Sequence, residues 1–285
     1  MGSSLLPVPK RKFGWTDAKV PVIGQGTWKI EGNGRVEDRQ RAIEALKLGL
    51  DLGLTHIDTA EMYGNGRVEE EIVAKAISER REEVFLVSKV WPSNASYEGT
   101  LKACQRSLNR LKTDWLDLYL LHWPSDRYNI KETMHAMEKL VDDGLIRFIG
   151  VSNFYTKGLE EAEQALTKYR IACDQVPYNL GNRQIEHGLL PYCTDRNIAI
   201  VGYSPFGHGN YPSLTSIQGK VLDDIAKRHD RTPRQVVLNY LTRNPSVFTI
   251  PKATNFQHVR ENSSSVGDWN LTNKDIADIN RTFSI

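Results

Sequence analysis

The sequence predicts an α/β fold, a (β/α)8 barrel with an N-terminal β-hairpin that closes its bottom. Eight short runs rich in β-branched residues alternate with amphipathic stretches along the 285 residues, and most runs are followed by a helical stretch. A chain of this length suits one large α/β domain. Because no linker, repeat or low-complexity segment divides the chain, residues 1–285 are expected to form a single barrel domain.

The predicted strands and helices follow one another in a regular order. Each strand run is rich in Val, Ile, Leu, Phe or Tyr, whereas each helical stretch repeats apolar residues at spacings of three and four. The predicted strands cover residues 20–24, 54–57, 84–88, 115–121, 146–151, 172–176, 199–203 and 248–250. The predicted helices cover residues 37–52, 68–80, 97–111, 130–143, 159–167, 189–196, 220–229, 233–243, 256–264 and 273–282.

Residues 10–20 are expected to form the hairpin under the barrel. The two halves of this segment flank Gly14 and Asp17, which are residue types that favour turns. Two long loops, residues 203–217 and the segment after Trp123, follow predicted strand ends at the opposite rim. Long loops at that rim build the pockets of barrel proteins.

The main alternative fold is a doubly wound open sheet. Such a sheet normally carries a G-x-G-x-x-G fingerprint between its first strand and the following helix. Here the first predicted strand leads into Gly24 and Gly26, with no third glycine at the required spacing and no helix directly after it. The barrel is therefore the preferred fold.

Composition and charge exclude several classes of partner. A hydrophobic share of 40%, a charged share of 25% and a net charge of +2 are ordinary for a globular protein and predict neither nucleic-acid nor membrane binding. No apolar stretch reaches the ~20 residues of a membrane span, and residues 1–7 lack the features of a secretion signal. Cys104, Cys173 and Cys193 form no CxxC pair and are expected to be buried thiols. We expect a cytoplasmic monomer or weak oligomer without a metal site.

Three consecutive predicted strands lead into ionisable residues. These residues are Asp58, Lys89 and His122, and Tyr63 lies just beyond the first of them. Because successive strand ends of a parallel barrel lie side by side at one rim, the four side chains are expected to share one small space. A buried ammonium is costly without a carboxylate, so Lys89 is expected to pair with Asp58.

The four side chains together suit proton transfer to a carbonyl oxygen. A cation within reach lowers the pKa of a phenol by roughly 1–3 units, so Tyr63 beside Lys89 is expected to be a stronger acid than free tyrosine. His122 is expected to orient the carbonyl oxygen or share the proton transfer. Each residue alone is more often structural, but their joint position at successive strand ends favours an active site that reduces a C=O group.

Seven motifs in the chain resemble the aldo-keto reductases, and the likeness runs from about residue 20 to residue 262. The motifs are residues 53–64 (GLTHIDTAEMYG), 87–91 (VSKVW), 118–124 (LYLLHWP), 149–154 (IGVSNF), 175–179 (QVPYN), 202–206 (GYSPF) and 250–254 (IPKAT). The resemblance implies a (β/α)8 barrel, in agreement with the strand pattern. It also implies a catalytic tetrad of Asp58, Tyr63, Lys89 and His122, in which Tyr63 is the acid in carbonyl reduction and the base in alcohol oxidation.

The resemblance further implies a nicotinamide dinucleotide cofactor beneath the loop of residues 203–217. Ser152, Asn153 and Gln175 match the positions that hold the carboxamide, for which side chains with both donors and acceptors are suited. Tyr203 matches the ring that stacks on the nicotinamide. The expected cofactor contacts in this part of the chain are Gly26, Thr27, Trp28, Asp58, Ser152, Asn153, Gln175, Tyr203, Ser204 and Phe206.

Residues 252–262 are expected to bind the adenosine phosphate end of the cofactor. The resemblance assigns this role to Lys252, Ala253, Thr254, Asn255, His258, Glu261 and Asn262. Lys252 is the expected contact to a 2′-phosphate, but Ala253 stands where relatives carry a hydroxyl and His258 where they carry an arginine. The helix that starts near Asn255 is expected to offer free backbone N–H groups to the phosphate. NADPH is the predicted cofactor, with NADH as the alternative, because neutral His binds phosphate less firmly than Arg.

The substrate pocket is expected to lie above the tetrad. Three tryptophans each follow a different strand and are expected to surround its mouth, which gives Trp28, Tyr63, Trp91, His122 and Trp123 as substrate contacts. Phe206, His208 and Tyr211 are expected to close over the cofactor. The chain ends at Ile285, soon after its last helix, and this favours a wide pocket with broad tolerance.

The sequence therefore predicts an NADPH-dependent reductase of small aldehydes, ketones or sugars that also oxidises alcohols in reverse. One alternative is a barrel lyase or isomerase that uses Lys89 as a Schiff-base nucleophile, against which the neighbouring Asp58 and Tyr63 count. The other is a nicotinamide-binding regulatory subunit without turnover.

Overall fold

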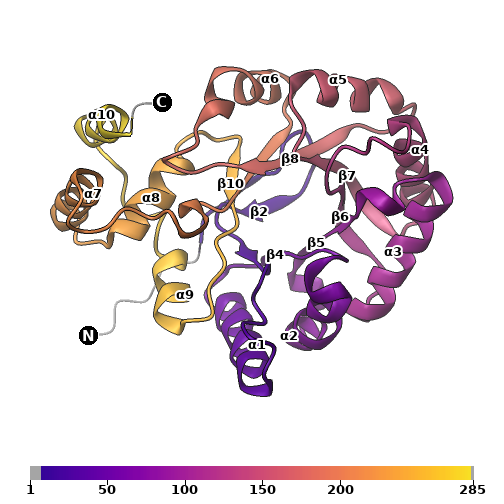
Figure 1. Ribbon diagram of the computed structural model, residues 1–285, viewed down its shortest axis with the longest axis horizontal. Coiled ribbons are helices and arrows are strands. Elements are labelled where there is room, and N and C mark those ends of the chain that lie inside the picture. Colours follow the sequence, from indigo (N-terminus) through magenta and orange to yellow (C-terminus); the bar gives the residue numbers. More distant parts are fainter. Residues whose placement is uncertain (1–7, 284–285) are drawn as a thin grey trace.

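An eight-stranded parallel sheet curls into a barrel in the computed structural model, which describes residues 8–283 (Figure 1). Neighbouring strands of the sheet are consecutive in the sequence. The barrel is closed by a parallel bridge between Ile23 and Thr249 and by a 2.8 Å hydrogen bond from the Gly24 amide to the Thr249 carbonyl. The predicted (β/α)8 barrel is confirmed. The expectations about a secretion signal and about the chain end concern residues 1–7 and Ile285, which lie outside the described residues.

The barrel strands bring their carboxyl ends to one rim. They are β3 (Gln25–Gly26), β4 (His56–Asp58), β5 (Phe85–Val90), β6 (Leu116–Leu121), β7 (Ile146–Ser152), β8 (Ile171–Pro177), β9 (Ala199–Tyr203) and β10 (Val247–Thr249). Asp58 pairs in register with Val87, so Lys89 lies one inward-facing position further along β5. Ser152 pairs with Gln175 in the same way on β7 and β8.

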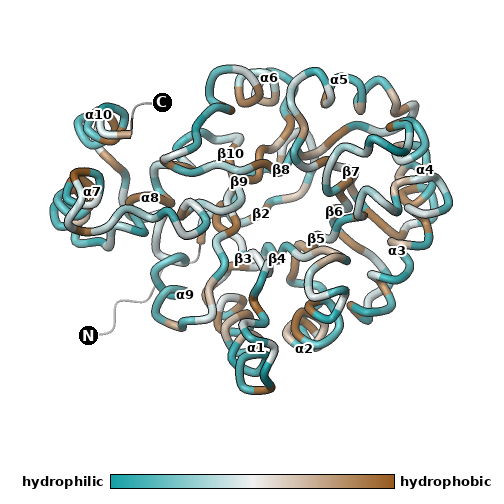
Figure 2. Tube along the Cα trace, viewed as in Figure 1, coloured by the Kyte–Doolittle hydropathy of each residue, from teal (hydrophilic) through white to brown (hydrophobic). Residues whose placement is uncertain are grey.

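Helices surround the barrel and turn their apolar faces toward it, as the brown segments of Figure 2 show. They are α1 (Val36–Asp51), α2 (Ala74–Ile77), α3 (Tyr97–Leu111), α4 (Ile130–Asp142), α5 (Thr156–Ala165), α6 (Leu189–Arg196), α7 (Ile217–Arg228), α8 (Pro233–Leu241), α9 (Phe256–Ser263) and α10 (Asn273–Thr282). Short helical turns lie at η1 (Tyr63–Gly66), η2 (Val68–Val73), η3 (Arg81–Glu83), η4 (Pro92–Asn94), η5 (Gln184–His187) and η6 (Gly207–Gly209). Helices α7 and α10 pack on each other at one side (Figure 1).

The predicted hairpin is present and covers the amino ends of the strands. It consists of β1 (Lys10–Lys12) and β2 (Lys19–Pro21), which pair antiparallel. Phe13, in the turn, is fully buried in the barrel, with ring centroids 5.1 Å from Phe85 and 5.0 Å from Phe248. Gly14 has a positive φ of 59°, and a Cβ there would lie 2.5 Å from the Asn197 carbonyl oxygen, so only glycine fits this close approach.

Two predicted elements differ from the observed ones. The run at residues 20–24 is not the first barrel strand, because residues 19–21 belong to the hairpin and β3 begins only at Gln25. Residues 20–24 are all buried, so their apolar pattern does not show where the hairpin strand ends and the barrel strand begins. The predicted helix at residues 68–80 is divided into the π-helical turn η2 and the short α2. Within η2 the buried Glu69 carboxylate accepts hydrogen bonds from Ser88, Ser107 and Arg110, a tertiary constraint that helical periodicity does not reveal.

The three cysteines are free and buried, as predicted. Among residues 8–283 no helix has the length and apolar character needed to cross a membrane.

Candidate active site

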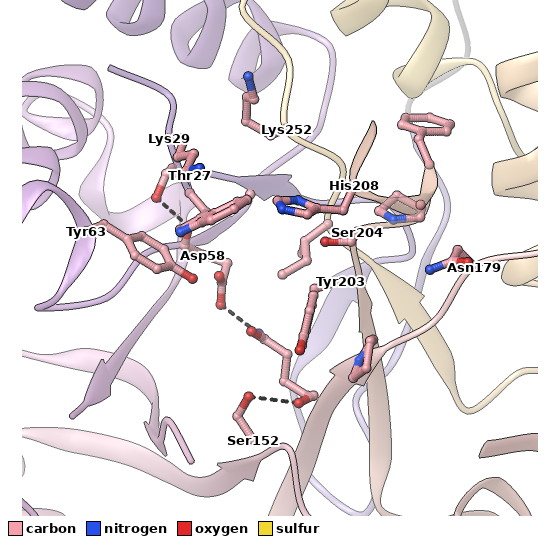
Figure 3. Close-up of a pocket in the computed structure, with 18 of the residues that line it drawn as sticks. Thr27, Lys29, Asp58, Tyr63, Ser152, Asn179, Tyr203, Ser204, His208 and Lys252 are labelled. Carbon is pink, nitrogen blue, oxygen red and sulfur yellow. Dashed lines mark hydrogen bonds between the residues drawn. The ribbon is translucent and has the colours of Figure 1, made fainter. Parts of the chain in front are cut away.

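A cavity of about 1000 Å³ opens at the carboxyl ends of the strands, at the upper end of the usual ~300–1,000 Å³ for ligand pockets (Figure 3). Most of the residues predicted to form the site line it. They are Gly26, Thr27, Trp28, Asp58, Tyr63, Trp91, His122, Trp123, Ser152, Gln175, Tyr203, Ser204, Phe206 and Lys252. The residues come from strand ends and loops around the whole barrel, so the cavity is built by the closure of the sheet.

Lys89, which does not itself line the cavity, forms a buried ion pair with Asp58, which does. The Lys89 side chain is fully buried, and its Nζ lies 2.7 Å from Asp58 Oδ1. The other two ammonium protons have acceptors in the Thr59 carbonyl oxygen at 2.8 Å and Tyr63 Oη at 3.3 Å. Burial alone would lower the pKa of Lys89, but Asp58 and Tyr63 together outweigh it and raise that pKa. Lys89 is therefore a fixed cation.

Tyr63 is brought next to this cation by the turn η1, which follows β4. The Lys89 Nζ lies 5.1 Å from the centroid of the phenol ring and within hydrogen-bonding distance of its oxygen. The expectation that Lys89 gives Tyr63 a lowered pKa is wrong. Burial raises the pKa of Tyr63 and Asp58 adds to it, and together they exceed the opposite effect of Lys89. The phenol is consequently protonated at neutral pH, and Lys89 is placed to stabilise the phenolate that forms when the proton leaves.

His122 follows β6 and lies beside Tyr63, with ring centroids 5.8 Å apart and planes at 74°. Burial and then the charge of Lys89 lower its pKa to about 2, so the imidazole is neutral. Its Nδ1 is buried and has no hydrogen-bond partner within residues 8–283. A neutral ring in this position can donate or accept one hydrogen bond to a ligand but adds no charge.

One wall of the cavity is formed by polar side chains from β7, β8 and β9. The Gln175 amide donates a 2.7 Å hydrogen bond to Asp58 Oδ2, and the Ser152 hydroxyl donates one of 2.8 Å to the Gln175 carbonyl oxygen (Figure 3). Tyr203 donates a 2.7 Å hydrogen bond from its hydroxyl to Asn153 Oδ1, while the Asn153 amide donates to the His122 carbonyl oxygen. Asn153 thus holds the Tyr203 ring in place, although it does not itself line the cavity.

The three tryptophans lie around the mouth of the cavity. Trp91 packs edge-to-face on His122, with centroids 5.3 Å apart, and its backbone amide donates a 2.7 Å hydrogen bond to Glu61 Oε1. Glu61, which the sequence did not single out, also accepts from Asn94 and so ties the two loops together. Trp123 has 44% of its surface exposed, which leaves its ring free to contact a ligand.

The segment of residues 252–262 reaches the cavity only through Lys252. The other predicted contacts of this segment do not line it, and they are Ala253, Thr254, Asn255, His258, Glu261 and Asn262. Two of the backbone N–H groups at the start of α9 that were expected to be free already have an acceptor. Asn255 Oδ1 accepts from the backbone amides of Gln257 and His258, at 2.8 and 3.4 Å, because an Asn at the N-cap satisfies these donors itself.

Sequence reasoning did not find several residues of the cavity, among them Lys29, Asn179 and Arg234. Asn179 ends the recognised motif of residues 175–179 and Lys29 follows the predicted contact Trp28, so their position in the chain was an available signal. Arg234 lies at the start of α8 and had no such signal. No group of three or more His, Cys, Asp or Glu side chains suited to a metal occurs within residues 8–283.

A (β/α)8 barrel with a lysine, a carboxylate, a phenol and an imidazole together at its carboxyl rim has the architecture of a barrel enzyme. Residues 22–282 match the model of the aldo/keto reductase family, and the chain belongs to that family. It is 39% identical over 267 residues to the methylglyoxal reductase YeaE of Escherichia coli (strain K12), covering 94% of this chain and 92% of that one.

Two further relatives agree with this assignment. The glyoxal reductase of Bacillus subtilis (strain 168) is 37% identical over 262 residues, covering 90% of this chain and 87% of the relative. The crystal structure of an aldo-keto reductase from Klebsiella pneumoniae in complex with NADPH superposes with a TM-score of 0.89 at 38% identity. That match covers 98% of this chain and 96% of the other.

Proposed function

We propose that this protein is an NADPH-dependent reductase of small aldehydes and ketones and that Tyr63 is its proton donor. The observation that carries the proposal is the position of Tyr63 Oη in a large cavity, 3.3 Å from the buried Lys89 ammonium. Membership of the aldo/keto reductase family supports it, as do relatives named as reductases and a related structure with NADPH bound.

The cavity suits a nicotinamide dinucleotide, which would supply the hydride. Hydroxyl and amide groups of Ser152 and Gln175 lie at one side of it, where a neutral carboxamide needs donors and acceptors. Tyr203 presents a ring beside them, and Lys252 lies on the opposite side of the view in Figure 3. Neutral polar groups at one end and a cation at the other match the two ends of such a ligand.

The contacts among Tyr63, Lys89 and Asp58 support a route for proton transfer. Tyr63 Oη would donate its proton to the substrate oxygen as the carbonyl carbon is reduced, and the phenolate would be stabilised by the Lys89 ammonium. The Asp58 carboxylate holds that ammonium in place. Neutral His122 would orient the carbonyl oxygen by one hydrogen bond. In alcohol oxidation the same atoms act in reverse, with Tyr63 as base.

A Schiff-base role for Lys89 is disfavoured by the same contacts. Its Nζ is fully buried, is paired with a carboxylate and has an acceptor for each of its three protons. A nucleophilic amine must instead be neutral and accessible. Lys89 is therefore proposed as a fixed charge that acts on Tyr63.

We propose small 2-oxoaldehydes as the first substrates to test, because relatives carry the names methylglyoxal reductase and glyoxal reductase. The rings of Trp91 and Trp123 would contact the apolar part of larger aldehydes and ketones. Broad tolerance is expected, since Asp58, Tyr63 and His122 act on the carbonyl and the tryptophan rings beside them offer apolar contacts of little selectivity.

The experiment is to compare wild type with Tyr63→Phe in NADPH oxidation with methylglyoxal and in NADPH binding. Loss of a general acid should reduce kcat by about 10²- to 10⁴-fold. NADPH affinity should change little, because the substitution removes only the hydroxyl. Unchanged turnover would contradict the role of Tyr63. Stoichiometric NADPH binding by wild type without turnover on a panel of aldehydes, ketones and sugars would instead favour the regulatory subunit.

A further inference from the structure

We propose that Arg234 binds a phosphate group of the dinucleotide cofactor and is a major determinant of cofactor affinity in this chain. This inference rests on the proposed function. Arg234 is the second residue of α8, and it reaches the wall of the same cavity that contains the Tyr63 hydroxyl and Lys252. The nicotinamide end of the cofactor would then lie near Tyr63, and its phosphates near Arg234 and Lys252, which come from segments far apart in the sequence.

The Arg234 guanidinium packs against two aromatic rings. Its Cζ lies 4.6 Å from the centroid of Phe206 and 5.0 Å from that of Tyr211, and the two rings meet at 77° with centroids 5.9 Å apart. Both rings belong to the loop after β9, which forms another part of the cavity wall. Such contacts engage the π faces of the rings and use none of the hydrogen-bonding capacity of the guanidinium N–H groups.

The N–H donors of Arg234 are free within residues 8–283. No ion pair or hydrogen bond joins its guanidinium to any other group in the part of the chain that the structure describes. The nearby Arg231 differs, because it donates to Asp268 Oδ2 at 2.8 Å. A half-buried guanidinium that lines a cavity and has free donors is suited to bind an anion through bidentate hydrogen bonds.

The charges around the cavity favour a ligand with several negative charges. Lys29, Arg234 and Lys252 approach from three different elements, and none of them forms an ion pair within residues 8–283. The carboxylate that lines the described cavity is Asp58, which lies at the floor and is neutralised by Lys89. A cavity lined by one sign of charge concentrates its field on a ligand of the opposite sign.

The start of α9 cannot replace Arg234 in this role. Its Gln257 and His258 amides are already taken by the Asn255 side chain, and His258 does not line the cavity. Arg234 is consequently the guanidinium available to the phosphates, alongside the exposed ammonium of Lys252.

The test is equilibrium titration of NADPH and NADH into wild type and Arg234→Met, followed by the quenching of protein fluorescence. The variant keeps an apolar stem against the two rings but removes the charge. Affinity should fall by about 10- to 100-fold. If the affinities for NADPH and NADH both fall, Arg234 binds the pyrophosphate that the two cofactors share. If only the affinity for NADPH falls, Arg234 binds the 2′-phosphate. Unchanged affinity for both overturns the inference.

A matched control and a salt series separate charge from loop structure. Arg170→Met removes a guanidinium that stacks on Trp15, 5.3 Å from its ring centroid, at the bottom of the barrel, and it should leave both affinities unchanged. Wild-type affinity should weaken as NaCl rises, and Arg234→Met should show a shallower dependence. Equal salt dependence in both proteins would mean that Arg234 only orders the loop, and would overturn the proposal.

The failure of this inference is distinguishable from the failure of the proposed function. Wild type that binds neither cofactor defeats both. Wild type that binds NADPH and reduces methylglyoxal, with Arg234→Met of equal affinity, defeats only the assignment of Arg234. Near-normal circular dichroism of the variant and partial recovery in Arg234→Lys would show that a lost charge, not a lost fold, causes the change.

Discussion

The imidazole of His208 packs on the indole of Trp28, with ring centroids 4.6 Å apart and planes tilted by 39°. Trp28 follows β3, whereas His208 lies in the loop after β9, so the contact joins two walls of the cavity. The Lys29 ammonium lies 4.5 Å from the centroid of the same indole. A ligand that extends beneath this contact would be released only when the two rings separate.

His208→Ala is expected to accelerate the release of NADPH. An aromatic pair contributes roughly 0.5–1.5 kcal/mol, which corresponds to about a 2- to 10-fold faster dissociation. Stopped-flow displacement of bound NADPH measures the rate directly. His187→Ala removes an exposed imidazole in η5 and serves as the control. Equal release rates in wild type and His208→Ala would show that the contact does not retain the ligand.

Asp174→Asn is expected to stabilise the protein at neutral and alkaline pH. Asp174 is fully buried in β8, and burial raises its pKa well above the usual value, against the smaller opposite effect of the Phe154 backbone amide. The folded state therefore keeps a proton that the unfolded chain releases above pH ~4. Stability should fall as pH rises from there toward the folded pKa, by at most about 1.4 kcal/mol per pH unit.

Thermal unfolding at pH 5 and pH 8 tests this prediction. The gain in Tm from Asp174→Asn should be larger at pH 8, because only in wild type does unfolding release a proton, which favours the unfolded chain as the pH rises. Asp195→Asn, at an exposed position of α6, is the control and should change little at either pH. A gain that does not depend on pH would contradict the assignment of a protonated Asp174.

His56→Leu is expected to reduce the loss of stability on acidification. His56 is buried in the barrel, edge-on to Phe13 and Phe85, and burial followed by the charge of Lys89 lowers its pKa from 6.5 to about 3. Its contribution is constant above pH 6.5 and is lost as the pH falls toward 3, because the unfolded chain takes up the proton first. The slope is about 1.4 kcal/mol per pH unit.

Urea unfolding between pH 7.5 and pH 5 measures this slope. Below pH 6.5, unfolding of His56→Leu should take up close to one proton fewer than unfolding of wild type. Its stability should therefore fall less steeply with decreasing pH, whatever its absolute stability. His135→Leu, exposed on α4, should follow the wild-type slope. If all three proteins share one slope, His56 is not the group that titrates on unfolding.

The barrel and the meeting of Asp58, Tyr63, Lys89 and His122 could be predicted without coordinates. Short apolar runs that alternate with stretches of helical period define strands and helices locally, and parallel strands must bring their ends to one rim. A residue at the end of one strand must therefore lie beside the residues at the ends of the preceding and following strands. The same logic fails at residues 20–24, where one buried run supplies both a hairpin strand and the approach to β3.

Local pattern determined which side chains lie at the rim of this protein, since strand period and parallel order depend on neighbouring residues alone. Only the tertiary structure decided the protonation of Tyr63, because desolvation depends on everything packed around the phenol and here exceeds the effect of Lys89. It also decided that Arg234 reaches the cavity and that Asn255 occupies the amides of α9. Such contacts join segments through space, and no spacing along the chain encodes them.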